Sequence, residues 1–122
     1  MKQENVNRLL KNFPEVYGRN FYFGVGDGWF NLIYKLSQDI TDLCRERGME
    51  VPKALQVKEK FGGLRFYPSG VSSDEVHEMI YRAESESRKI CEQCGSTENV
   101  TAQPKAGFGW IKTLCAKCRN TQ

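Results

Sequence analysis

The longest periodic run of apolar residues lies between Gly28 and Gly48, and it marks the expected centre of the fold. Eight apolar side chains recur there at helical spacing: Trp29, Phe30, Leu32, Ile33, Leu36, Ile40, Leu43 and Cys44. A stripe this wide predicts a helix with one face in the core, ended by Gly48. Cys44 falls on that stripe without a metal-binding neighbour, so we interpret it as a small hydrophobic residue.

Two shorter helical patterns flank this run. Residues 4–12 place apolar side chains one turn apart, which predicts a short amphipathic helix that Pro14 helps to end. A second main helix is expected after a cap at Ser72 or Ser73, and it is predicted to run into Cys91 without a linker. Its narrower apolar stripe consists of Val76, Met79, Ile80, Ala83 and Ile90.

Between the two main helices, apolar and polar residues alternate on both sides of Gly62-Gly63, which predicts a β-hairpin. Four apolar residues are expected to face the core: Leu55, Val57, Leu64 and Phe66. The opposite face then carries Gln56, Lys58, Lys60, Arg65 and Tyr67. Basic residues beside an aromatic ring favour a surface that binds nucleic acid or an acidic protein. The alternative is an ordinary outer face on which lysines protect an edge strand.

The spacing Gly24-x-Gly26-x-Gly28 is similar to that of a phosphate-binding loop. It lacks the Gly-Lys-Ser/Thr ending, however, and Trp29 stands where a dinucleotide-binding loop has its third glycine. Asp27 is placed to cap the following helix, where its carboxylate would occupy the position that a phosphate needs. We therefore interpret this segment as a structural turn.

The C-terminal part of the chain carries two Cys-x-x-Cys pairs, Cys91/Cys94 and Cys115/Cys118, separated by twenty residues. Two thiolates three positions apart on a tight turn can bind one Zn²⁺, and two such turns complete a closed tetrahedron. Gly95 follows the first pair, where such a turn passes through positive φ. The two pairs predict a zinc ribbon with a structural Zn²⁺. The alternative is a set of cysteines that are free or disulfide-linked.

Two strands are expected between the cysteine pairs, at 99–103 and 109–114, with a turn over 104–108. Phe108 and Trp110 lie in and after this turn. They form either an exposed recognition tip, together with Lys105 and Lys112, or an aromatic plug that packs the ribbon onto the long helix, because small ribbons have little core of their own. An exposed tip, or the edge of the hairpin, could also make a homodimer.

Together these patterns predict an α+β fold, with two main helices and a short N-terminal helix packed with a β-hairpin, plus a docked C-terminal zinc ribbon. We expect residues 1–89 to form the core and residues 90–122 the ribbon, within one compact domain, because 122 residues are too few for two independent ones. No apolar run is long enough for a signal peptide or a membrane span. A cytoplasmic location is expected, and five cysteines, an odd number, fit a reducing compartment.

The formal net charge of +3 counts every cysteine as neutral. Binding of one Zn²⁺ by four thiolates would lower this charge to +1, so most of the basic excess would disappear. A nonspecific nucleic-acid binder depends on many contacts to phosphates. The sequence therefore favours a protein partner, with nucleic acid as the alternative.

Four motifs stand out along the chain: GDGWFNLI at 26–33, VKEKFGGLRFY at 57–67, ICEQCG at 90–95 and GWIKTLC at 109–115. Together they resemble a group of small proteins of bacteriophages and prophages, over most of residues 22–118. The resemblance implies a phage or prophage origin and a metal site, without implying an activity. Small phage proteins often bind and block a host or defence component, so an inhibitory role is one expectation.

We predict that the protein is not an enzyme, because a closed Cys₄ site leaves no coordination position for a substrate. A small zinc-dependent nuclease is the alternative, since some nucleases carry paired cysteines around their catalytic element. Such sites need a histidine general base, and the segment between the cysteine pairs contains no histidine. His77, the only histidine, is expected on the surface of the second main helix.

Overall fold

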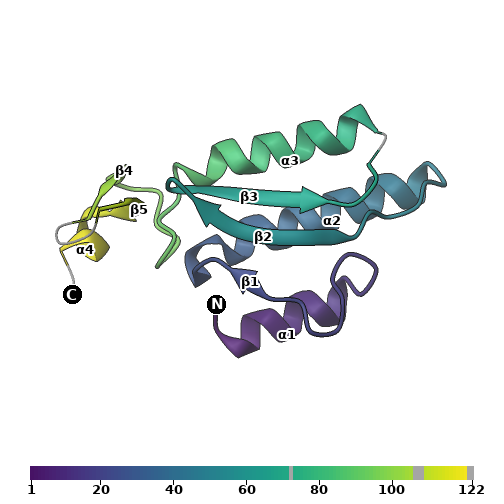
Figure 1. Cartoon of the computed structure of the whole chain (residues 1–122), viewed down its shortest axis with the longest axis horizontal. Helices are drawn as coiled ribbons and strands as arrows, with labels where there is room; N and C mark the ends of the chain where they lie inside the picture. Colours follow the sequence, from purple (N-terminus) through teal and green to yellow (C-terminus); the bar gives the residue numbers. More distant parts are fainter. Residues whose placement is uncertain (72, 106–108, 121–122) are drawn as a thin grey trace.

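The computed structural model describes residues 1–71, 73–105 and 109–120, and it shows an α+β chain. The core contains a three-stranded sheet in the order β1-β2-β3, formed by Phe23–Gly24, Ala54–Lys60 and Gly63–Pro68. Helix α2 lies behind this sheet and α3 beside it, and a second, two-stranded sheet lies at one end of the core (Figure 1). The predicted fold class is confirmed.

Helix α2 (Phe30–Glu46) is the central helix of the core, and a short 3₁₀ helix, η1 (Asp27–Trp29), leads into it. Cys44 is buried on its apolar face, as predicted. The same face also buries Ser37 and Thr41, which the apolar pattern does not reveal. Their hydroxyl groups donate to the carbonyls of Ile33 and Ser37, one turn earlier, so neither carries an unpaired donor into the core.

The side chain of Asp27 binds the start of helix α1 (Gln3–Asn12), and this corrects the predicted role of that residue. Asp27 was expected to cap the helix that follows it, but the cap residue of η1 is Gly26. The Asp27 carboxylate instead accepts from the backbone N–H of Lys2 (2.7 Å) and from the side chain of Asn5 (3.0 Å). A free N–H donor at the start of α1 is thus paired by a residue far away in the sequence.

Strands β2 and β3 form the predicted antiparallel hairpin, and the two residues of β1 pair in parallel with β2. Val57, Leu64 and Phe66 are buried, as predicted, but the prediction for Leu55 is wrong, because 67% of this residue is exposed. The register shifts between Ala54 and Gln56, so Leu55 is an extra residue without a partner on β3. Ala54 is buried at the end of the hairpin where Leu55 was expected.

Helix α3 (Asp74–Ser87) covers the outer edge of β3. Ser73 caps it by accepting from Val76, as one of the two predicted caps, while Ser72 lies outside the described residues. Two side chains of α3 accept from backbone N–H groups of β3: Ser87 from Leu64 and Glu84 from Phe66, both at 2.9 Å. The backbone N–H donors at this edge of β3 are therefore paired by side chains of α3. The helix ends at Ser87, earlier than predicted.

Candidate metal centre

The first cysteine pair lies on a tight turn shortly after α3. The backbone N–H of Gly95 donates to the Cys91 carbonyl (2.9 Å), and Cys91 N–H donates to Ser96 (2.8 Å). Gly95 has a φ of +84°, which glycine adopts without steric cost. The sequence prediction for this turn is therefore confirmed.

The second pair lies where β5 (Ile111–Cys115) passes into the short helix α4 (Ala116–Arg119). Cys115 is the cap residue of this helix, and its sulfur accepts from the backbone N–H of Cys118 at 3.4 Å. Strand β5 pairs with β4 (Val100–Pro104), so the two predicted strands are present, with bounds shifted by one or two residues. The pairing of β4 with β5 therefore brings the two cysteine turns close together.

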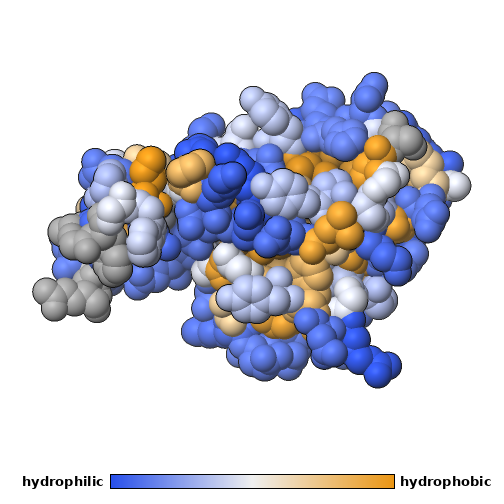
Figure 2. Space-filling view, in the orientation of Figure 1, coloured by the Kyte–Doolittle hydropathy of each residue, from blue (hydrophilic) through white to orange (hydrophobic). Residues whose placement is uncertain are grey.

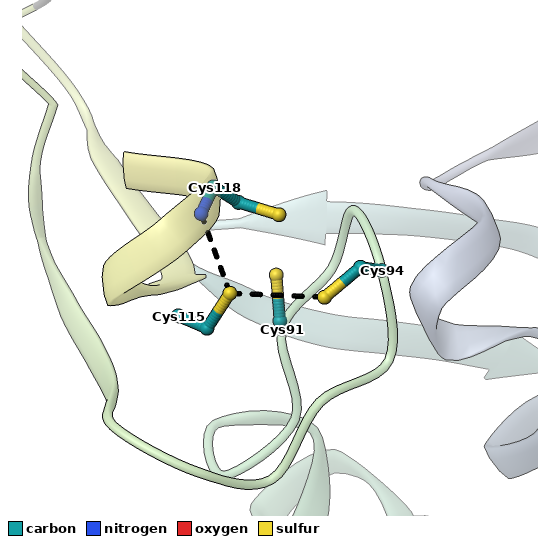
Figure 3. Close-up of side chains that lie close together, drawn as sticks. All are labelled: Cys91, Cys94, Cys115 and Cys118. Carbon is teal, nitrogen blue, oxygen red and sulfur yellow. Dashed lines mark hydrogen bonds between the residues drawn. The ribbon is translucent and has the colours of Figure 1, made fainter. Parts of the chain in front are cut away.

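The four sulfur atoms converge on one point. They lie within 4.8 Å of one another, and those of Cys94 and Cys115 are 3.7 Å apart. Figure 3 shows the four side chains pointing toward a common centre from the two turns. A tetrahedral ion with metal–sulfur bonds of about 2.3 Å separates its sulfurs by roughly 3.8 Å. The four cysteines therefore could hold one metal ion.

The surroundings of the sulfurs differ among the four cysteines. Cys91, Cys115 and Cys118 are buried, whereas Cys94 is exposed. Burial disfavours ionisation of the Cys91 thiol, but backbone N–H groups directed at its sulfur outweigh this and lower its pKa to about 7. Burial and the neighbouring cysteine sulfurs raise the pKa of Cys118 to about 12. The Cys91 thiol therefore loses its proton more readily than those of Cys94 and Cys118, whose pKa is raised and from which a bound cation must displace protons.

A glycine-rich loop of the core holds the first cysteine turn in place. Gly28 N–H donates to the Glu92 carbonyl (2.7 Å), and Gly26 N–H donates to the Glu92 carboxylate (3.0 Å). The indole N–H of Trp29 donates to the carbonyl of Ile90 at 2.9 Å. A Cβ atom on Gly28 would lie 2.0 Å from the Cys91 carbonyl oxygen. The segment whose glycine spacing is similar to that of a phosphate loop is thus a docking surface for the first cysteine turn.

The tip of the β2–β3 hairpin makes a second contact with the cysteine-bearing segment. The buried Thr113 hydroxyl donates to the Gly62 carbonyl, and Thr113 in turn accepts from Glu92 N–H at 3.0 Å. One residue of β5 therefore connects the hairpin tip with the first cysteine turn. This link could not be predicted from the sequence, because Thr113 is polar and fits an exposed strand position equally well.

Comparison with protein-family models, with curated proteins and with solved structures finds no match for this chain. The geometry of the described residues is therefore the basis for assigning the site. Within these residues, no helix is long and apolar enough to cross a membrane.

A cavity of about 360 Å³ lies beside the first cysteine turn. Its lining includes Asp27, Glu92, Lys105 and Lys112. Burial raises the pKa of Glu92, which also accepts from Gly26 N–H. The described lining contains none of the four cysteines.

The predicted partner-binding residues fall into two groups. Lys58, Lys60, Arg65 and Tyr67 lie on strands β2 and β3, where Lys58 and Arg65 are direct cross-strand partners. Trp110, which is 59% exposed, and Lys112 belong to the cysteine-bearing segment. Phe108 lies outside the described residues. The structure thus brings the hairpin residues together, while Lys112 lines the cavity beside Glu92.

Sequence reasoning missed Tyr22, which is 82% exposed. A Cβ on Gly24 would contact the Tyr22 ring (3.4 Å) and Cβ of Lys58 (3.5 Å), so this ring lies next to the hairpin lysine. The neighbourhood depends on the parallel pairing of Gly24 with Lys58. A strand of two residues leaves no periodic signal, so the sequence alone could not place Tyr22 there.

Proposed function

We propose that this chain is a non-enzymatic binding protein in which one structural Zn²⁺, held by Cys91, Cys94, Cys115 and Cys118, fixes the C-terminal segment to the core. The convergence of the four sulfurs within 4.8 Å is the observation that carries the proposal. Zn²⁺ is the ion that four thiolates in tetrahedral geometry most commonly bind, and such sites are structural when all ligands come from the protein.

The same ligand set argues against catalysis at the ion. Four cysteine ligands leave no position for water or substrate, and a zinc-dependent nuclease would also need a general base. His77, the only histidine of the chain, is exposed on α3, and one of its ring nitrogens lies 3.2 Å from the Val71 carbonyl. It belongs to a different element from the cysteines, so the proposal assigns it no catalytic role.

The proposed partner is a protein that binds the outer face of the β2–β3 hairpin. This face presents Lys58, Lys60 and Arg65 beside Tyr67, a combination of charge and ring that suits recognition of an acidic surface. We also propose a phage or prophage origin, on the basis of the sequence motifs, and a role in inhibiting a host or defence component. Identifying the partner tests the inhibitory role as well as the binding surface.

The test compares partner capture by the parent protein and a charge-reversed variant. The tagged full chain and Lys58→Glu/Arg65→Glu are produced in the bacterial host, and co-purifying proteins are identified by mass spectrometry. We expect a specific partner with the parent protein that disappears with the variant. Lys35→Glu/Arg82→Glu is the matched control, because it changes the net charge equally at two exposed side chains of α2 and α3.

Equal capture by the parent and the hairpin variant would reject the hairpin as the binding surface. Zinc is measured in each sample, so a variant that has lost the ion is recognised as misfolded.

A further inference from the structure

The open face of the three-stranded sheet carries a row of positive charge that spans two strands. Gly24 pairs with Lys58, and Lys58 pairs with Arg65, so the three residues lie side by side across the sheet. Figure 1 shows the sheet in front of α2, with no described helix covering the near side. Figure 2, in the same orientation, shows hydrophilic surface over β2 and β3 next to hydrophobic patches.

The two cations of this row face each other without a counter-ion. Like charges directly opposite on neighbouring strands destabilise a sheet. Among the described residues, no ion pair involves Lys58, Lys60 or Arg65. Glu59, the only acidic residue of the two strands, accepts from Gly62 N–H at 2.7 Å in the turn. The hairpin thus keeps an unneutralised pair of charges that an anionic partner would stabilise.

Aromatic rings lie on both sides of Lys58. Its ammonium group is 5.8 Å from the centre of the Tyr67 ring, and Tyr22 lies over Gly24 on the other side. Tyrosine presents a large, rigid ring that loses little conformational entropy when a partner binds. The pair of Lys58 and Arg65 therefore lies beside exposed tyrosine rings, which are typical of a binding surface.

Exposed apolar side chains mark the two ends of β2. Leu55, the extra residue of the bulge, and Phe61, in the hairpin turn, are 67% and 61% exposed. The ammonium of Lys60 lies 5.6 Å from the centre of the Phe61 ring. Six strand intervals separate Leu55 from Phe61, which corresponds to roughly 20 Å of extended chain. The order along the strand is apolar, cationic, apolar.

We propose that this surface, the hairpin face (Tyr22, Leu55, Lys58, Phe61, Arg65 and Tyr67), binds an extended segment of a partner protein whose acidic centre is flanked by apolar residues. The inference rests on the proposed function and names the chemistry of the partner. Carboxylates of the segment pair with Lys58 and Arg65, and its apolar side chains cover Leu55 and Phe61. Leu55 favours a protein over a nucleic acid, because single-stranded nucleic acid is bound through phosphate contacts and through stacking of bases on aromatic rings, and a leucine provides neither.

A selection experiment tests this specificity directly. A library of random short peptides is selected on the immobilised, zinc-loaded full chain, and enriched peptides are synthesised for affinity measurements. We expect enriched sequences with acidic residues between apolar ones. Their affinity falls by at least about tenfold for Lys58→Glu/Arg65→Glu, since like charges then face each other, and stays unchanged for Lys35→Glu/Arg82→Glu. Leu55→Ser is expected to weaken binding without changing its salt dependence.

Three outcomes would overturn the inference. They are no enriched peptide, enriched peptides without acidic residues, and equal affinity for the parent and the hairpin variant. A single-stranded oligo-dT is titrated in parallel at two salt concentrations. Tighter binding of this probe than of the peptides, lost at high salt and in the hairpin variant, would instead assign the face to nucleic acid. Metal content and thermal unfolding of every variant separate these results from failure of the zinc site.

Discussion

At the scale of single residues, Gly28 shows how closely the core approaches the first cysteine turn. Its N–H donates to the Glu92 carbonyl, and the Cys91 carbonyl oxygen occupies the space where a side chain would begin. The residue that positions the first cysteine pair is thus a glycine more than sixty positions earlier in the chain. Such a glycine is required by close packing of two backbones.

Gly28→Ala is expected to destabilise the protein by about 1–3 kcal/mol, the usual cost of forcing extra volume into a packed site. The free energy of unfolding is measured in urea at a fixed zinc concentration. Gly18→Ala is the matched control, because a Cβ there meets no atom within 4 Å, and we expect a change within about 0.5 kcal/mol. Equal stability of the two variants would contradict the docked arrangement.

At the scale of secondary-structure elements, helix α3 protects the outer edge of strand β3. Ser87 accepts from Leu64 N–H and donates to the Glu84 carbonyl, while the Glu84 carboxylate accepts from Phe66 N–H. Two buried or half-buried backbone donors of an edge strand are thus paired by one helix. This arrangement keeps the edge from pairing with another chain.

Ser87→Ala is predicted to lower the free energy of unfolding by about 1–3 kcal/mol, because the buried N–H of Leu64 loses its acceptor. Ser85→Ala, at an exposed position of the same helix, is the control and is expected to leave stability nearly unchanged. Thermal unfolding followed by circular dichroism compares the two. If Ser87→Ala unfolds like the control, then α3 does not protect the strand edge as described.

Periodicity predicted the elements well and their connections poorly. Helices α1, α2 and α3, the β2–β3 hairpin and both cysteine turns follow from local patterns of apolar residues, glycines and cysteines, whereas η1 and α4 were not predicted. The prediction for Leu55 failed because a bulge shifts the strand register at this residue. The prediction for Asp27 failed because its carboxylate accepts from the start of α1, which is far away in the sequence. Both outcomes depend on contacts between segments far apart in the sequence, and no local pattern records such contacts.

The four cysteines could be grouped from spacing alone, because Cys-x-x-Cys pairs are specific. The contacts that hold these cysteines against the core could not be predicted from the sequence. Thr113 and Glu92 look like ordinary polar residues in the sequence, yet they join β5 to the hairpin tip and the first turn to the glycine-rich loop.

At the scale of the whole molecule, the buried apolar residues form two separate clusters. The large cluster fills the space among α1, α2, α3 and the three-stranded sheet. The small cluster consists of Cys91, Leu114, Cys115 and Cys118, with Val100 packed against it. Most of its members are the candidate metal ligands themselves. Because this segment buries so little apolar surface, we expect it to depend on a metal ion for its order.

Removal of the metal by a chelator is therefore expected to loosen the cysteine-bearing segment before the core. Hydrogen exchange measured by mass spectrometry should show loss of protection over residues 91–119, while α2 and β2–β3 stay protected. Addition of Zn²⁺ should restore the protection. Uniform loss over the whole chain would mean that the core depends on the ion, and unchanged protection would mean that the ion holds nothing in place.

The most direct test of the account is X-ray absorption at the zinc edge of the purified protein, together with its metal content. We expect one Zn²⁺ per chain with four sulfur neighbours at about 2.3 Å and no oxygen or nitrogen neighbour. A folded protein without metal, or an ion with a water ligand in place of one sulfur, would contradict it.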